Sequence, residues 1–188
     1  KKMLQHFIKH VSRSGFFSPS PNVLICVPCG ATQVERRAIK ESAVEAGARD
    51  VFLIDEPIAA SLGAGVDISV SSGHMIIDIG GGTSEIAITS LNGLVYADSL
   101  RTAGDTFNDE IVKYIRHEHS IIIGETTAER IKEDIGSAFK VTMVKRKTYV
   151  GRGVSSGLPE KFIMTSTQVL EALTEPLSAL ISGIRMAL

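Results

Sequence analysis

The residues best suited to chemistry are three consecutive glycines between an acid and a hydroxyl, in the segment Asp78-Ile79-Gly80-Gly81-Gly82-Thr83. Consecutive glycines let backbone N–H groups point into one concavity and let a phosphate approach the chain closely. In a dinucleotide-binding fold such glycines open a helix, whereas here they precede EIAIT, whose alternation predicts a strand. The pattern favours a hairpin whose turn binds phosphate, with Asp78 able to hold Mg²⁺ through water and Thr83 offering a hydroxyl. An ordinary glycine-rich hairpin is the alternative that three glycines alone leave open.

Other reactive residue types occur at spacings that favour structural roles. Cys26 and Cys29 are spaced like a redox pair, but Cys26 lies within an apparent strand and the sequence has no second cysteine pair for zinc, so we expect two small core residues. The segment His117-Glu118-His119 lacks the i,i+4 spacing of a helical metal site and predicts a solvated helix end. The basic run at 145–147 predicts a solvated strand edge.

The elements that must position these residues follow from the apolar periodicity. Short apolar runs at 23–27 and 51–54 predict buried strands, which alternate with helices expected at 32–47 and 57–62. Thr32 begins the first of these helices, with a glutamate at capping-box spacing. This β-α-β-α order is typical of a layered α/β domain.

A predicted β-meander follows, and then a mostly helical region. Strands are expected at 75–79, 85–89 and 94–100, and Asn92-Gly93 is a strong signal for a hairpin turn. Helices are expected at about 106–117 and from about 126, followed by a polar, half-exposed sheet region at 140–157 and a final helix that Pro176 should kink.

The composition excludes several classes of protein. The 20 Lys+Arg residues nearly balance the 21 Asp+Glu residues, so we expect no nucleic-acid partner. A hydrophobic fraction of 44% is too high for intrinsic disorder. No apolar run approaches the roughly 20 residues of a membrane span, and two cysteines without an export signal indicate a reducing cytoplasm.

Longer stretches of the sequence resemble one known family. The glycine turn resembles the second phosphate loop of actin-like ATPases, and four stretches together resemble MreB, the bacterial rod-shape actin family: VPCGATQVERRAIKESAVEAGA, VFLIDEPIAASLGAG, DIGGGTSEIAITSLNGLVY and AERIKEDIGSA. The resemblance implies an α/β fold of the actin-like ATPase (ribonuclease H-like) type. It also implies four parts, namely the end of the first large subdomain at 1–65, the second large subdomain at 66–139, a small α+β insertion at 140–164 or from slightly earlier, and the truncated return helix of the second subdomain at 165–188.

The resemblance further implies ATP and Mg²⁺ as cofactors. It places phosphate contacts on the glycine turn, with Asp78 toward the metal: Gly80, Gly81, Gly82 and Thr83. Glu56 stands in the family's Glu-Pro-x-Ala-Ala motif, whose glutamate positions the attacking water, so we expect Glu56 and Thr83 to orient that water. Alone, a Glu-Pro pair would indicate only charge compensation at a helix N-terminus.

Two further segments resemble the nucleoside-binding parts of the family. AERIK resembles the nucleoside-binding helix, which implies contacts from four residues, the first and last of them polar: Glu129, Arg130, Ile131 and Lys132. By itself this spacing would indicate a surface pair. Gly104-Asp105 resembles the loop that approaches the ribose, although Ala103 stands where the family often has glycine.

The ends of the chain predict a piece of a longer protein, because both lie within helical patterns that lack a start or stop signal. Two loops of the family pattern have no counterpart in this sequence, an early Asp-x-Gly-Thr phosphate loop and a late glycine-rich adenine loop. We therefore expect that the isolated chain neither binds ATP tightly nor hydrolyses it.

For the whole protein, the resemblance implies an ATP-dependent filament that maintains rod cell shape and organises peptidoglycan synthesis. The expected partners are further copies in double protofilaments, the cell-wall elongation machinery and the inner membrane, at whose cytoplasmic face the protein should lie. Phe16 and Phe17 are the candidate membrane contact, with packing under their own loop as the alternative. Val34 lies on the helix that packs between protofilaments in the family, with a position in the core as the alternative. The rival interpretations are a non-polymerising ATPase of the same superfamily, chaperone-like or kinase-like, and a binding module with a degenerate site.

Overall fold

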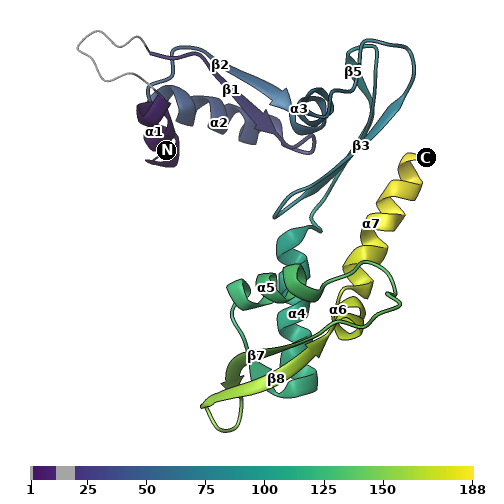
Figure 1. Ribbon diagram of the computed structural model, residues 1–188. Coiled ribbons are helices and arrows are strands. Elements are labelled where there is room, and N and C mark those ends of the chain that lie inside the picture. Colours follow the sequence, from purple (N-terminus) through teal and green to yellow (C-terminus); the bar gives the residue numbers. More distant parts are fainter. Residues whose placement is uncertain (1, 12–19) are drawn as a thin grey trace. The chain divides into compact units, whose positions relative to one another are not determined.

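The computed structural model describes residues 2–11 and 20–188, which form two compact units (Figure 1). Unit 1 comprises Lys1–Asp78 and Glu85–Ser99, and unit 2 comprises Ile79–Ser84 and Leu100–Leu188. The glycine turn therefore belongs to unit 2, although the strands on either side of it lie mainly in unit 1. Phe16 and Phe17 lie outside the described residues. Within the part of the chain that is described, no helix combines the length and apolar character needed to cross a bilayer.

Unit 1 is built on two parallel strands with helices after each. Its first elements are α1 (Lys2–Val11), β1 (Val23–Val27), α2 (Gln33–Glu45), β2 (Val51–Asp55) and α3 (Glu56–Gly63). β1 and β2 pair in parallel, as the β-α-β order predicts. The predicted capping box at the start of α2 is confirmed, because the Thr32 hydroxyl accepts a hydrogen bond from the Glu35 amide at 3.2 Å and the Glu35 carboxylate accepts one from the Thr32 amide at 2.8 Å.

The prediction that both strands are buried is wrong for one face of this small sheet. Val27 is fully buried, but Leu24 is 63% exposed and Phe52 is 57% exposed. Successive strand residues alternate between the two faces of a sheet. Among the described residues, packing covers the face that contains Val27 and leaves the alternate side chains in solvent.

The predicted meander is present as strands β3 (His74–Ile79), β4 (Ser84–Ser90) and β5 (Gly93–Leu100), in the order β3-β4-β5. Its hairpin turn lies one residue earlier than Asn92-Gly93. Leu91 and Asn92 have φ values of 49° and 60°, which is the pair of left-handed residues that a two-residue hairpin loop requires. The turn is held there because the Leu91 and Asn92 amides donate to the carbonyls of Val70 and Ile68 at 3.0 and 2.8 Å.

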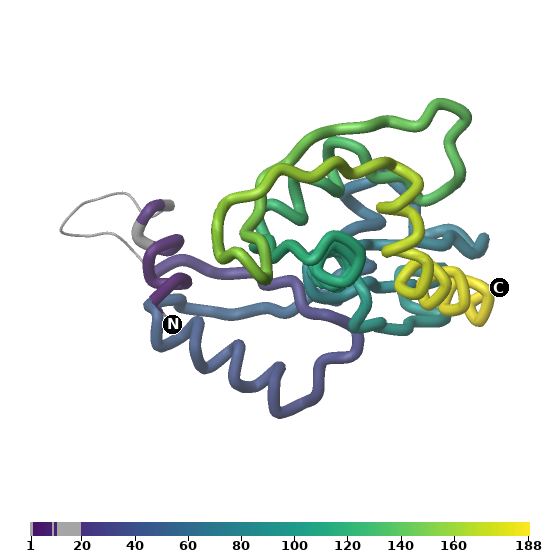
Figure 2. Tube along the Cα trace, turned by 90° about the horizontal axis from the view of Figure 1, so that it is seen from below, coloured from purple at the N-terminus to yellow at the C-terminus, as the bar shows by residue number. Residues whose placement is uncertain are grey.

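Unit 2 packs helices against a small antiparallel sheet. Its elements are α4 (Gly104–His119), β6 (Ile121–Ile122), α5 (Glu125–Ile135), β7 (Arg146–Gly153), β8 (Pro159–Thr165), α6 (Ser166–Ala172) and α7 (Thr174–Ala187). The sheet order is β6-β7-β8. α4 contacts α5, β6 and α6, and Figure 2 shows it nearly end-on at the centre of these elements. The core is formed by side chains of all these layers, including Ile111, Ile115, Ile131, Tyr149, Phe162 and Met164.

The expected kink in the final helix is a full break between α6 and α7. The break falls at Leu173, three residues before Pro176. Proline has no N–H to donate to the carbonyl four residues earlier, so one helix cannot continue through it. It is tolerated in a first helical turn, and Pro176 stands in the first turn of α7.

Candidate functional site

The glycine turn is exposed, as a phosphate-binding turn must be. Gly80, Gly81 and Gly82 are exposed, and the Gly80 amide donates to the Thr83 carbonyl at 2.9 Å to close the turn. None of the three glycines has a positive φ. A Cβ on Gly81 would lie 3.3 Å from a carboxylate oxygen of Asp105, whereas a Cβ on Gly82 would meet no atom within 4 Å. The turn and the start of α4 are therefore in tight contact.

A cavity of about 570 Å³ opens beside this turn, entirely within unit 2. Its wall is formed by the glycine turn, the first residues of α4, one flank of α5 and the start of α7: Ile79, Gly80, Gly81, Gly104, Asp105, Phe107, Glu129, Lys132, Gly136, Ser137, Ala138, Leu173 and Leu177. Backbone hydrogen bonds connect these segments. The amides of Gly104 and Asp105 donate to the carbonyls of Gly80 and Gly81 at 3.0 and 2.8 Å. The Lys132 ammonium donates to the Gly104 carbonyl at 3.1 Å, which connects α5 to the same point.

The cavity brings together only part of the residue set that the sequence indicates. Glu129 and Lys132 line it, but Ile131 is fully buried in the core of unit 2. The Arg130 guanidinium lies over the Tyr149 ring, 5.9 Å from the ring centre, and does not line the cavity. Gly82 and Thr83 are also outside its wall.

Sequence reasoning missed the apolar part of the wall, formed by Phe107, Leu173 and Leu177. Leu173 and Leu177 belong to the apolar stripe of the final predicted helix. The stripe does not show which of its residues pack in the core and which line a cavity. At the end of α5, the Gly136 amide donates to the Lys132 carbonyl at 2.9 Å, and a Cβ on Gly136 would overlap that oxygen.

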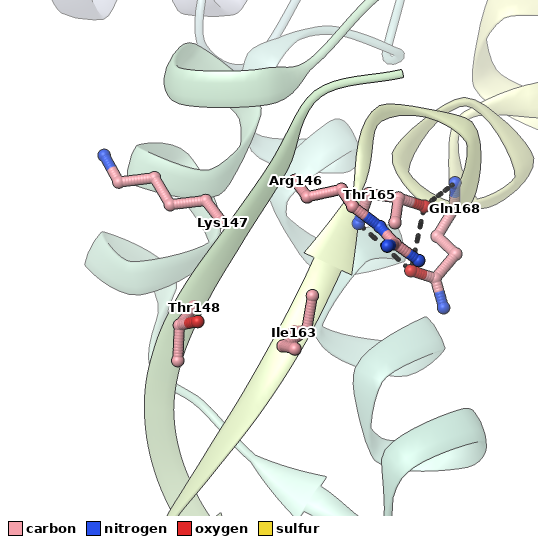
Figure 3. Close-up of a pocket in the computed structure, with 6 residues that line it drawn as sticks. All are labelled: Arg146, Lys147, Thr148, Ile163, Thr165 and Gln168. Atoms are coloured by element: carbon pink, nitrogen blue, oxygen red, sulfur yellow. Dashed lines mark hydrogen bonds between the residues drawn. The ribbon is translucent and has the colours of Figure 1, made fainter.

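A larger depression, of about 690 Å³, lies away from these residues on the β7–β8 hairpin (Figure 3). Arg146, Lys147 and Thr148 form much of its wall, and all three are exposed. Because its wall consists mostly of exposed surface side chains, it is a weaker candidate than the cavity beside the glycine turn.

Unit 1 contains three carboxylates that interact electrostatically. Glu56 is the first residue of α3, Asp78 is near the end of β3, and Glu85 is near the start of β4. Burial raises the pKa of Glu56, and the negative charges of Glu85 and Asp78 raise it further. A carboxylate of raised pKa is a better proton acceptor for water.

Glu85 is a buried carboxylate that the sequence did not single out. It is 1% exposed, and it accepts hydrogen bonds from the Cys29 amide at 3.1 Å, the Cys29 thiol at 2.6 Å and the Ser99 hydroxyl at 2.5 Å. Burial raises the pKa of the Cys29 thiol to about 12, with a further contribution from Glu85. The alternation of EIAIT predicts an exposed glutamate, but β4 is the central strand of its sheet and is covered on both sides.

The expectation of two small core cysteines is wrong for Cys26, which is exposed, while Cys29 is half-buried. Both are free thiols. Within residues 2–11 and 20–188, no group of three or more His, Cys, Asp or Glu side chains is arranged to hold a metal ion. His117 and Glu118 are exposed, as expected for a solvated helix end, but His119 is half-buried and its ring centre lies 5.6 Å from that of Phe162. Val34 is 78% exposed, which excludes a core role within unit 1.

Comparison with known proteins identifies the family. The family model described as MreB/Mbl protein matches residues 1–188. This chain belongs to the MreB/Mbl family. It is 54% identical over 188 residues to the cell shape-determining protein MreB of Escherichia coli strain K12, covering all of this chain and 54% of that protein. It is 41% identical over 186 residues to the cell shape-determining protein Mbl of Bacillus subtilis strain 168, covering 99% of this chain and 56% of that protein. The chain thus spans about half the length of the curated relatives it matches.

Solved structures show the corresponding fold. MreB5 of Spiroplasma citri bound to AMPPNP matches with a TM-score of 0.90 and 38% identity, over 99% of this chain and 57% of that one. A MamK double helical filament matches with a TM-score of 0.77 and 21% identity, over 99% and 55%, which shows the fold alone. The predicted MreB family membership and mixed α/β actin-like fold are confirmed.

Proposed function

We propose that this chain forms part of an ATP-binding, filament-forming MreB that maintains rod cell shape. The observation that carries the proposal is a cavity within unit 2 whose wall joins the glycine turn, the Gly104-Asp105 segment and the Glu129–Lys132 flank of α5. These are the segments that the family resemblance assigns to phosphate, ribose and nucleoside. MreB5 of Spiroplasma citri, a relative of the same family, has been solved with AMPPNP and with ADP.

The cavity has the chemistry that a nucleotide needs. Phe107, Leu173 and Leu177 offer an apolar surface against which a base packs. Glu129 can accept hydrogen bonds from ribose hydroxyls, and Lys132 donates to Gly104 with one of three N–H groups, so two remain for the ligand. The exposed backbone of Gly80 and Gly81 lies at the same wall for the phosphates.

Asp78 and Glu56 fit the remaining tasks of phosphoryl transfer. A protein site for Mg²⁺ typically supplies only one or two carboxylates, with phosphates and water completing the shell, which agrees with the absence of a larger ligand cluster in the described residues. Asp78 would hold Mg²⁺ through water, and the ion would neutralise phosphate charge. Glu56, with its raised pKa, would accept a hydrogen bond from the attacking water and orient it, together with the Thr83 hydroxyl.

The proposal extends to assembly and location at the level of the whole protein. Self-association in double protofilaments, contact with the elongation machinery and attachment at the inner membrane follow the family resemblance, as does the division at 65/66, 139/140 and 164/165. The MamK filament shows that a protein of this fold assembles into a double helix.

An NMR titration of the 188-residue chain with AMPPNP tests the cavity. We expect weak binding, with amide shifts concentrated at Gly80, Gly81, Gly104 and Lys132. Lys132→Met should weaken binding at least threefold. The matched control is Lys113→Met, which removes an exposed lysine whose ion pair with Glu110 is 2.7 Å long and lies away from the cavity wall. Unchanged spectra at saturating nucleotide would refute the site.

Turnover and assembly are tested in the longer protein that contains these residues. Glu56→Gln should lower the ATPase kcat by about 10²-fold or more while nucleotide affinity changes little, because the group acts on water. Pelleting with ATP separates the rivals, since the absence of an ATP-dependent polymer would favour a non-polymerising ATPase. Loss of turnover in Glu56→Gln would count against a degenerate binding module.

A further inference from the structure

Four side chains form a polar cluster between α5 and β7, on the side of α5 away from the cavity. The Asp134 carboxylate oxygen Oδ2 accepts hydrogen bonds from the Tyr149 hydroxyl at 3.0 Å and the Lys147 ammonium at 2.7 Å. Arg130 and Lys147 each place their cation 5.9 Å from the centre of the Tyr149 ring. Two residues of α5, one turn apart, are therefore held by two residues of β7. We call these four residues the α5–β7 clamp.

The clamp differs from an ordinary surface ion pair because its centre is buried. Tyr149 is only 3% exposed and packs in the core with Phe162. Burial raises the pKa of its hydroxyl, and the bond to Asp134 raises it further, so the group stays a donor. Lys147 lies two residues before Tyr149 on the same strand face, and Figure 3 shows its side chain on the opposite side of β7 from that of Arg146.

The three faces of α5 have different neighbours. Ala128, Ile131 and Ile135 pack in the core, Glu129 and Lys132 line the cavity, and Arg130 and Asp134 join the clamp. At 100° a residue, the clamp face and the cavity face are about 150° apart around the helix axis. A rotation of α5 that releases one face must therefore move the other.

A small rotation of α5 would be enough to break a hydrogen bond at the cavity. With side chains about 6 Å from the axis, a rotation of about 10° displaces them by about 1 Å. The hydrogen bond from Lys132 to the Gly104 carbonyl is 3.1 Å long, and a shift of about 1 Å would break it. Gly104 in turn donates to the glycine turn at Gly80.

We propose that the α5–β7 clamp positions the nucleoside helix, so that Asp134, Tyr149 and Lys147 set the placement of Lys132 and Glu129 in the cavity. The inference rests on the proposed function in assigning a nucleotide to that cavity. These three are positioning residues, since none of them lines the cavity. The cavity geometry thereby depends on the β7–β8 hairpin, which contributes no wall residue of its own.

Tyr149→Phe is the variant that tests the inference, because it removes only the hydroxyl and keeps the buried ring. Asp134→Asn is the second variant, and Lys113→Met is the matched control, since it removes an ion pair that is also 2.7 Å long. The first measurement is the set of amide ¹H–¹⁵N shifts of the 188-residue chain without nucleotide. We expect both clamp variants to move the resonances of Gly104 and Lys132, across the helix from the substitution, and the control to leave them in place. The second measurement is AMPPNP affinity, which should weaken roughly threefold to tenfold in both clamp variants.

A purely structural role would lower the melting temperature but leave the cavity resonances and the affinity of the folded chain unchanged, and that result would overturn the inference. Failure of the wild-type chain to bind AMPPNP would sink the proposed function of the cavity instead. In that case the shifts measured without nucleotide still decide whether the clamp sets the cavity geometry.

Discussion

The substitution Ile131→Ala tests whether Ile131 is a core residue or a ligand-binding residue. The family resemblance implies a nucleoside contact at this position, whereas the structure buries the side chain completely, at 0% exposure, in the core of unit 2. The substitution removes three carbon groups, which costs about 2.4 kcal/mol at about 0.8 kcal/mol for each. The cavity left behind adds to this, so we expect unit 2 to lose about 3 to 4 kcal/mol of stability.

Urea unfolding of the chain, followed by amide exchange at unit 2 residues, measures that loss. Ile181→Ala on α7 is the matched control, because this isoleucine is 50% exposed and should cost less than about 1 kcal/mol. The AMPPNP affinity of the fraction that stays folded should change little in Ile131→Ala. A stability loss below about 1 kcal/mol combined with lost AMPPNP binding would show that Ile131 faces the ligand and that the assignment of the helix faces is wrong.

Three further outcomes follow from local features of the structure. Leu91→Asn should stabilise unit 1 by about 0.5–1 kcal/mol in urea unfolding, because leucine tolerates its φ of 49° poorly and asparagine tolerates it well; a destabilised variant would contradict this turn. Iodoacetamide at pH 8 should label exposed Cys26 at least roughly tenfold faster than Cys29, whose thiol is half-buried, bonded to Glu85 and raised in pKa to about 12; equal rates by mass spectrometry would disprove the bond. The hydrogen bond from Lys147 lowers the pKa of Asp134 below its usual range, so the folded state favours the ionised carboxylate. The stabilisation that this ionised form gives is present above about pH 4 and is lost as the pH falls through the lowered pKa. Asp134→Asn should therefore reduce the dependence of the melting temperature on pH below about pH 4. A variant whose melting temperature falls with acid as steeply as that of the wild type would argue against the ion pair.

Local sequence patterns predict those features that depend on near neighbours. The capping box of Thr32 and Glu35 forms as its spacing indicates, since both hydrogen bonds close within one helical turn. The hairpin after β4 forms one residue earlier than Asn92-Gly93, with Leu91 and Asn92 as its left-handed residues. The amides of these two residues donate hydrogen bonds to the carbonyls of Val70 and Ile68, which are distant in sequence. Proline likewise predicts an interruption near Pro176, while packing decides that it is a complete break at Leu173.

In the candidate site, too, the sequence indicated some of the residues and missed others. The glycine turn and the pair Glu129 and Lys132 were indicated by sequence, and all but the end of the turn line one cavity. Glu85 was not indicated, because its burial depends on Cys29 and Ser99 from other parts of unit 1. A charged residue in an alternating strand is ordinarily a solvent-facing residue.

By itself, the sequence determined the family and the mixed α/β class, and it indicated the glycine turn as the candidate for phosphate binding. Long ordered motifs and backbone preferences depend on residues that are adjacent in the chain, which is why they can be recognised without the fold. Only the tertiary structure decided which flank of α5 faces the cavity, that Arg130 turns to Tyr149, and that Ile131 belongs to the core. The physical reason is that the rotation of a helix about its axis is set by what packs on each of its faces. For α5 those neighbours are α4, the β7–β8 hairpin and α6, and they surround α5 only once unit 2 has folded.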